Sequence, residues 1–256
     1  MHRYLKIEMK RPRVAVFDFT DCEGCELQLV NKEETLVPFL QAIEVVNFRE
    51  ASSAKSDEYD VALIEGSISR ADEVERLKKI RERAKVLVAF GSCACFGGVN
   101  CMKNAFSMED VNRAVYGDAA KETMPVRAVK EVVKVDLEIP GCPVSKTEVE
   151  SIVQHLALDV PFQFEPYPVC VECKQRFTSC LMDKGQLCLG SITRAGCNAP
   201  CPAGGLGCWG CRGPAEAPNY HEFFALAAER GFSQREINER INFFGGFAGV
   251  RGEDAR

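Results

Sequence analysis

The sequence predicts an α/β protein with a mostly parallel, doubly wound sheet, followed by an irregular cysteine-rich region that contains a few helices. Two observations predict this fold class. Residues 1–160 alternate short apolar runs with amphipathic stretches, which is typical of βα units on a parallel sheet. Beyond this part of the chain the composition shifts to proline, glycine and cysteine. We therefore expect two domains, residues 1–160 and residues 161–256.

Short apolar runs predict the strands of the first domain at residues 14–19, 44–48, 59–64, 85–90 and 133–139. Amphipathic stretches predict helices at residues 26–40, 71–83 and 146–156. The stretch at 71–83 is typical of an amphipathic helix, because Val74, Leu77 and Ile80 recur at helical spacing between charged residues. Residues 100–125 show no clear pattern, so we interpret them as an insertion.

The second domain begins with a proline-spaced linker at residues 160–168. Near its end, two amphipathic stretches at residues 220–229 and 234–244 predict helices. We expect these helices to pack over the cysteine-rich segment or onto a partner.

Composition and charge exclude several classes of function. The net charge is -5 and the pI is about 5.5, so the chain has no broad basic surface for nucleic acid. No segment approaches the roughly 20 apolar residues that span a bilayer, and the start of the chain contains no apolar signal region. We therefore expect a cytoplasmic protein without a membrane span.

Fourteen cysteines are unusual for such a protein. A reducing cytoplasm disfavours disulfides and favours metal binding or catalysis. Cys22 and Cys25 follow the first expected strand, Cys93 follows the fourth and Cys142 follows the fifth. The carboxyl ends of parallel strands lie on one edge of a sheet, where ligands bind. Four thiolates there suit either a zinc ion or a [4Fe–4S] cluster, and the spacing leaves this choice open.

The second domain contains eight more cysteines close together in the sequence: Cys170, Cys173, Cys180, Cys188, Cys197, Cys201, Cys208 and Cys211. The segment between them is rich in Gly, Pro, Asn and Ser, with too few apolar side chains to fold unaided, so we expect bound inorganic centres to organise it. Twelve thiolates in three groups favour a chain of electron carriers.

Simpler interpretations apply to several of these cysteines. The pair Cys22 and Cys25 alone is also typical of a redox dithiol, and the pair Cys208 and Cys211 alone is typical of a zinc knuckle. Cys95 and Cys101 fit in none of the groups of four. We interpret both as thiols packed in the interior.

Six motifs occur in an order that carries a family resemblance: TDCEGCELQ (20–28), IEGSIS (64–69), AFGSCACFGG (89–98), IPGCPVSK (139–146), YPVCVEC (167–173) and CLGSITRAGCNAPCPAGGLGCWGCRGP (188–214). Together they resemble the small subunit of cytosolic, group 3 type [NiFe]-hydrogenases. The likeness is to the delta subunit of sulfhydrogenases and to viologen-reducing hydrogenase small subunits. It spans nearly the whole chain, and it implies a flavodoxin-like first domain and an iron–sulfur second domain.

The resemblance also implies three [4Fe–4S] clusters and their ligands. The proximal cluster would be held by Cys22, Cys25, Cys93 and Cys142. The distal cluster would be held by Cys170, Cys173, Cys180 and Cys188, and the medial one by Cys197, Cys201, Cys208 and Cys211. In membrane-type relatives a histidine occupies the first distal position, where this chain has Cys170. Glu65, in the EGS motif, is expected either as a buried carboxylate near the proximal cluster or as a residue that caps the next helix.

The function that the resemblance implies is conduction of electrons. The chain would relay them between the NiFe site of a large catalytic partner subunit and a flavin- or ferredoxin-type acceptor subunit, and it would not be catalytic alone. A relay subunit of another complex I-related oxidoreductase, a zinc-stabilised binding module and a disulfide reductase remain alternatives. The sequence does not identify the terminal acceptor.

Overall fold

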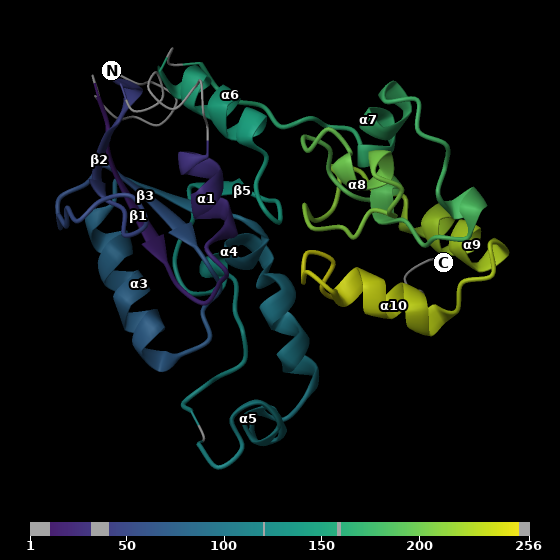
Figure 1. Cartoon of the computed structure of the whole chain (residues 1–256), viewed down its shortest axis with the longest axis horizontal. Helices are drawn as coiled ribbons and strands as arrows, with labels where there is room; N and C mark the ends of the chain where they lie inside the picture. Colours follow the sequence, from purple (N-terminus) through teal and green to yellow (C-terminus); the bar gives the residue numbers. More distant parts are fainter. Residues whose placement is uncertain (1–10, 32–40, 120, 158–159, 251–256) are drawn as a thin grey trace. The chain divides into compact units, whose positions relative to one another are not determined.

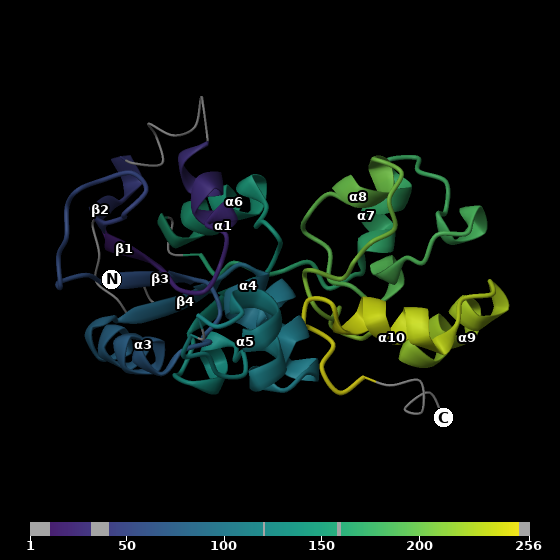
Figure 2. The same cartoon turned by 60° about the horizontal axis from the view of Figure 1, so that its bottom comes forward.

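The computed structural model describes residues 11–31, 41–119, 121–157 and 160–250. The chain divides into two compact units, Met1–Phe162 and Gln163–Arg256. Figures 1 and 2 show the first unit in purple to teal and the second in green to yellow. None of the described helices is both long and apolar enough to cross a bilayer.

A five-stranded parallel sheet forms the centre of the first unit. Its strands are β1 (Arg13–Asp18), β2 (Glu44–Asn47), β3 (Val61–Glu65), β4 (Val86–Phe90) and β5 (Leu137–Ile139). They lie in the order β2-β1-β3-β4-β5, and every pair is parallel. This is the flavodoxin-like strand order, so the predicted fold class is confirmed.

Helices cover both faces of this sheet. Figure 2 shows α1 (Gly24–Val30) and α6 (Lys146–Ala157) on one side and α3 (Ala71–Arg83) on the other. Because β4 is covered on both faces and flanked by two strands, all of its residues are buried. This explains why its sequence is a continuous apolar run rather than an alternating one.

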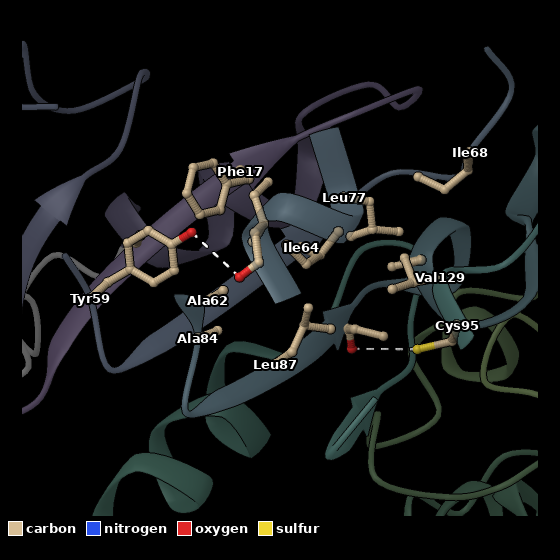
Figure 3. Packing of buried hydrophobic residues seen from close by; sticks show 14 of the residues in the cluster. Phe17, Tyr59, Ala62, Ile64, Ile68, Leu77, Ala84, Leu87, Cys95 and Val129 are labelled. Carbon is tan, nitrogen blue, oxygen red and sulfur yellow. Dashed lines mark hydrogen bonds between the residues drawn. The ribbon is translucent and has the colours of Figure 1, made fainter. Parts of the chain in front are cut away.

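The apolar core between the sheet and α3 is shown in Figure 3. Ile64, Leu77 and Leu87 are fully buried there. At one end of this core the Tyr59 hydroxyl donates to the Ile80 carbonyl at 3.5 Å. The Tyr59 ring also packs against the ring of Phe17. Burying one such aliphatic side chain contributes about 1.5–3 kcal/mol, so this cluster is a main source of stability for the first unit.

The helices predicted at 71–83 and 146–156 are confirmed, as α3 and α6. The helix predicted at 26–40 begins at Gly24, and its part at residues 32–40 lies outside the described residues. The last predicted strand is shorter than expected. Residues 133–136 precede β5; Val133 and Val135 pack against the core, and Asp136 donates its N–H to the Leu87 carbonyl of β4 at 2.9 Å.

Residues 100–125, which we interpreted as a patternless insertion, contain helical structure. A 3-10 helix spans Gly98–Ala105, and α5 spans Met108–Tyr116. Ser107 caps α5, because its hydroxyl accepts the Asp110 N–H at 3.1 Å. No residue of α5 is buried, so the core does not impose a long apolar pattern on it. The Ser-x-x-Asp capping signal is the feature that could have revealed it.

The second unit contains α7 (Val169–Gln175), the short α8 (Pro200–Ala203), α9 (Tyr220–Glu229) and α10 (Gln234–Asn242). The last two confirm the helices predicted at 220–229 and 234–244. A capping box begins α10, since Ser233 Oγ accepts the Glu236 N–H at 3.3 Å and Glu236 accepts the Ser233 N–H at 2.8 Å.

The second unit also has an apolar core of its own. Leu187, Leu189 and Ile192, from the cysteine-rich segment, pack against side chains of α9 and α10. Phe223 and Ile241 are among these, exposed by only 2% and 1%. The two helices thus pack over the cysteine-rich segment, as expected, and supply apolar side chains that the segment itself lacks.

Candidate metal centres

Four cysteines of the first unit lie after the carboxyl ends of the strands, as the sequence predicted. Cys22 and Cys25 follow β1, Cys93 lies in α4 (Ser92–Phe96) directly after β4, and Cys142 follows β5. Cys25 is buried, Cys93 is half-buried, and Cys22 and Cys142 are exposed. We call this set the strand-end quartet.

The thiols of the strand-end quartet influence one another electrostatically. Burial is the largest cause that raises the pKa of Cys93 to about 12, and Cys142 and Cys22 add to the rise. Burial also raises the pKa of Cys25, to which Glu65, Cys93 and Cys142 contribute. Such thiols keep their protons at neutral pH, so binding of a metal would have to displace those protons.

Glu65, the last residue of β3, is 2% exposed and belongs to the same site. Its two oxygens accept the backbone N–H groups of Cys25 at 3.0 Å and Glu26 at 2.6 Å. Burial raises the pKa of Glu65 to about 7, although the Cys25 N–H opposes the rise. Of the two expectations for Glu65, the buried carboxylate is confirmed, and the residue fixes the turn that carries Cys25. It does not cap α3: Glu73, in the first turn of that helix, accepts the N–H groups of Ser69 and Arg70, which immediately precede the helix.

Two glycines let the backbone approach these sulfurs. Gly91 has φ +91°, and a β-carbon there would lie 2.5 Å from Cys25 Sγ. Gly98 has φ +62°, and a β-carbon there would lie 2.5 Å from Cys93 Sγ. Any side chain at either position would displace a thiol as well as strain the backbone.

We predict that Gly91→Ala disrupts the strand-end quartet. The new methyl group would collide with Cys25 Sγ, so the purified protein should lose the iron expected there while the rest of its iron stays. Gly117→Ala is the matched control, because Gly117 also has a positive φ, +57°, but no atom lies within 4 Å of its β-carbon position. Iron analysis after anaerobic purification compares the two, and equal iron in both variants would contradict the prediction.

Cys95 and Cys101 lie outside the strand-end quartet. Cys95 is fully buried in the apolar core, where Figure 3 shows its Sγ directed at the Ala89 carbonyl, 3.5 Å away. Cys101 is half-buried in the 3-10 helix Gly98–Ala105. For Cys95 the expectation of a packed core thiol is confirmed.

We predict that Cys95→Ser leaves the iron content unchanged and lowers the free energy of unfolding by about 1–2 kcal/mol, because a hydroxyl replaces a thiol in an apolar site. Iron analysis and anaerobic denaturation test this. Loss of iron on this substitution would show that Cys95 is a ligand and would contradict the assignment.

In the second unit, Cys170, Cys173, Cys180 and Cys188 form one group. Burial is the largest cause that raises the pKa of Cys170 to about 12, followed by the thiols of Cys188, Cys173 and Cys180. A β-carbon on Gly190 would lie 3.4 Å from both Cys170 Sγ and Cys188 Sγ. The sulfurs of two cysteines that are well separated in the sequence thus face the same small volume.

The remaining cysteines of the second unit are less closely gathered. Burial raises the pKa of Cys197 to about 12, with Cys211 as a smaller cause, and Cys211 also contributes to the raised pKa of Cys208. Cys201 is exposed on α8. The two groups touch, because the Cys208 backbone N–H donates to Cys188 Sγ at 3.1 Å.

Two charged side chains beside these thiols were not singled out from the sequence. Glu172 lies between Cys170 and Cys173 and accepts the Gly196 N–H at 2.8 Å. Arg240 of α10 lies over the Trp209 ring at 3.5 Å and donates to the Leu187 carbonyl at 3.1 Å. Glu172 lies inside the CxxC motif of Cys170 and Cys173, and this position could have indicated from the sequence that it belongs to the site. Arg240 lies far beyond the last cysteine in the sequence, and no local pattern indicates its position.

The chemistry of these donors suits soft metals. The sets consist of cysteine sulfur only, and thiolates are the ligands of both structural zinc and iron–sulfur clusters. Among the residues that the structure describes, no three or more Cys, His, Asp or Glu side chains form a site for a single metal ion. Backbone N–H donation to a sulfur, as at Cys188, is one of the means by which a protein adjusts an iron–sulfur cluster.

Comparison with known proteins identifies the family. Residues 22–156 match the family model of the NADH ubiquinone oxidoreductase 20 kDa subunit, which covers more than half of the chain and all of the strand-end quartet. Sulfhydrogenase 2 subunit delta of Pyrococcus furiosus is 38% identical over 237 residues, which are 91% of this chain and 98% of that protein. The chain belongs to the hydrogenase small-subunit family.

Other relatives of this hydrogenase small subunit agree with that placement. A vhu-type F420-non-reducing hydrogenase subunit of Methanocaldococcus jannaschii is 29% identical over 238 residues, 80% of this chain and 82% of that protein. A chain in the crystal structure of an NAD+-reducing [NiFe]-hydrogenase in the H2-reduced state has a TM-score of 0.56 at 24% identity, and covers 60% of this chain and 96% of its own length. The structural likeness shows a shared fold.

Proposed function

We propose that this chain is the electron-transfer small subunit of a multi-subunit [NiFe]-hydrogenase. It conducts electrons between the NiFe site of a large catalytic partner and a flavin- or ferredoxin-type acceptor subunit. The observation that carries the proposal is the gathering of cysteines into groups in both units of a chain that is 38% identical to a sulfhydrogenase delta subunit over 91% of its length. Cytoplasmic location is part of the proposal, since the thiols must stay reduced.

Three [4Fe–4S] clusters are the cofactors that we propose, since such clusters accept and release single electrons. The strand-end quartet of Cys22, Cys25, Cys93 and Cys142 holds the proximal one. Two groups in the second unit hold the others: Cys170, Cys173, Cys180 and Cys188 the distal cluster, and Cys197, Cys201, Cys208 and Cys211 the medial cluster. Contact between Cys188 and Cys208 supports neighbouring positions for these two sites.

The chain's own residues give these sites their properties. Burial of Cys25 and Cys208 keeps water from the sulfurs, and the Cys208 N–H donates to Cys188 Sγ. Glu65 holds the backbone of Cys25 and Glu26 in place at the end of β3. Exposed Cys22 and Cys142 leave one side of the strand-end quartet open, which is where a partner can approach it.

Two alternatives make different predictions. The match of residues 22–156 to the NADH ubiquinone oxidoreductase 20 kDa subunit favours a relay subunit of another complex I-related enzyme. That match covers only the first unit, whereas the similarity to hydrogenase subunits extends into the cysteine-rich second unit. A zinc-stabilised module would suit the thiol sets as well, but it would be colourless and without acid-labile sulfide.

Anaerobic purification of the native complex tests the proposal. We expect a nickel-containing partner chain to co-purify, and H2 to bleach the brown iron–sulfur absorbance of the complex. A complex without nickel, or one in which iron–sulfur centres are present but H2 does not reduce them, would overturn the hydrogenase assignment. A complex I-related role would be indicated if NADH alone reduced the centres.

A further inference from the structure

Glu172 connects the two cysteine groups of the second unit. Its backbone lies in α7 between Cys170 and Cys173, but its side chain reaches the loop of the other group. The side chain is buried, with 7% of the residue exposed. One carboxylate oxygen, Oε1, accepts the Gly196 N–H at 2.8 Å, and the other, Oε2, lies 3.8 Å from Cys197 Sγ.

The contact between Glu172 and Cys197 would change from a hydrogen bond to a repulsion between like charges when a cluster binds. With a protonated thiol, the Cys197 S–H donates to Glu172 Oε2. A cysteine that ligates iron is a thiolate and has no proton to donate. The carboxylate then faces a negatively charged sulfur at close range in a buried site, where electrostatic interactions are strong. The Gly196 N–H, bound to Oε1, keeps the side chain in this position.

A positive charge acts on the same cysteine. Arg212 is 1% exposed, and its Nε donates to the carbonyl oxygens of Ala195 at 2.8 Å and Arg194 at 3.2 Å. Glu172 raises the pKa of the Cys197 thiol and Arg212 lowers it, so the two charges act on this cysteine with opposite signs. Such fixed charges, together with hydrogen bonds to sulfur, are the means by which a protein sets the potential of a cluster.

We propose that Glu172 lowers the reduction potential of the cluster that Cys197 ligates. This inference rests on the proposed function, because it requires the cluster to be bound. Reduction adds one electron to the cluster, and a carboxylate next to a ligand sulfur raises the energy of the reduced form more than that of the oxidised form. Glu172 acts through its charge and is not a ligand.

Glu172→Gln isolates this effect. The glutamine Oε1 can still accept the Gly196 N–H, so the loop keeps its anchor, while the charge is removed and an amide N–H faces the sulfur. A purely structural role predicts no change in potential for this variant.

Glu172→Asp keeps the charge but withdraws it by one methylene group. Glu239→Gln is the matched control, because Glu239 is an exposed carboxylate of the same unit, paired with Arg235 at 2.8 Å.

Anaerobic redox titration of the purified complex, followed by electron paramagnetic resonance, measures the potential of each cluster. The signal of interest is the one that Cys197→Ser removes or alters. We expect this signal to titrate at a more positive potential in Glu172→Gln, to shift less in Glu172→Asp, and to stay unchanged in Glu239→Gln.

Three results would overturn the inference. The first is full iron content with an unchanged or more negative potential in Glu172→Gln. The second is an equal shift in Glu239→Gln. The third is loss of iron from both Glu172 variants, which would show a structural role. By contrast, absence of iron from the wild-type protein would overturn the proposed function itself, so the two failures are distinguishable.

Discussion

Cys142→Ser is expected to remove the proximal cluster and to disconnect the chain from its catalytic partner. Cys142 is one of four ligands proposed at the strand ends, and a serine hydroxyl is a far poorer iron ligand than a thiolate. The iron content should fall by about four atoms per chain, which is one [4Fe–4S] cluster. H2-dependent dye reduction by the complex should fall to near background, since electrons would then lack their entry point. Iron analysis and the dye assay measure both effects.

The interpretation of this variant is direct because Cys142 is exposed, so its replacement leaves the apolar core untouched. Cys101→Ser is the matched control, since Cys101 is half-buried in the same unit and belongs to none of the proposed ligand sets. We expect that control to keep its iron and its dye reduction. Full iron and full dye reduction in Cys142→Ser would refute the proximal assignment.

Phe247→Ala is expected to destabilise the second unit by about 3–5 kcal/mol, the usual cost of truncating a buried phenylalanine. Phe247 is 2% exposed, and its ring lies against Gly210, where a β-carbon would be 2.7 Å from Cε2. Gly210 stands between Cys208 and Cys211. The cavity left by the ring would therefore loosen a proposed ligand turn as well as the core, and we also expect faster loss of iron.

Phe177→Ala is the control for that prediction. Phe177 is in the same unit but is 97% exposed, so its removal should change stability by no more than about 0.5 kcal/mol. Anaerobic denaturation monitored by the iron–sulfur absorbance compares the two variants. Equal denaturation midpoints would contradict the view that an apolar core stabilises the cysteine-rich unit.

The parallel sheet was predictable because its central strands β1, β3 and β4 are largely buried. β4 is a continuous apolar run, and α3 shows Leu77 and Ile80 at helical spacing, so local sequence and tertiary burial agree. α5 was missed, because it buries no residue and so carries only a short apolar pattern. Its N-cap residue, Ser107, is the sequence feature that indicates this helix.

The site was predictable to the extent that cysteines follow strands. Cys25, Cys93 and Cys142 are far apart in the sequence, yet the rule for parallel strands places them on one edge of the sheet. The direction of the Glu172 side chain could not be read from the sequence, since it depends on a loop much later in the chain. The amphipathic patterns of α9 and α10 indicated that these helices could pack over the cysteine-rich segment, but the pairing of their side chains with Leu189 required the structure.

Analysis of iron and acid-labile sulfide in the anaerobically purified protein tests the central claim most directly. Three [4Fe–4S] clusters predict about twelve iron atoms and about twelve sulfide ions per chain. A folded chain that contains zinc and no sulfide, or that contains no metal at all, would contradict the account.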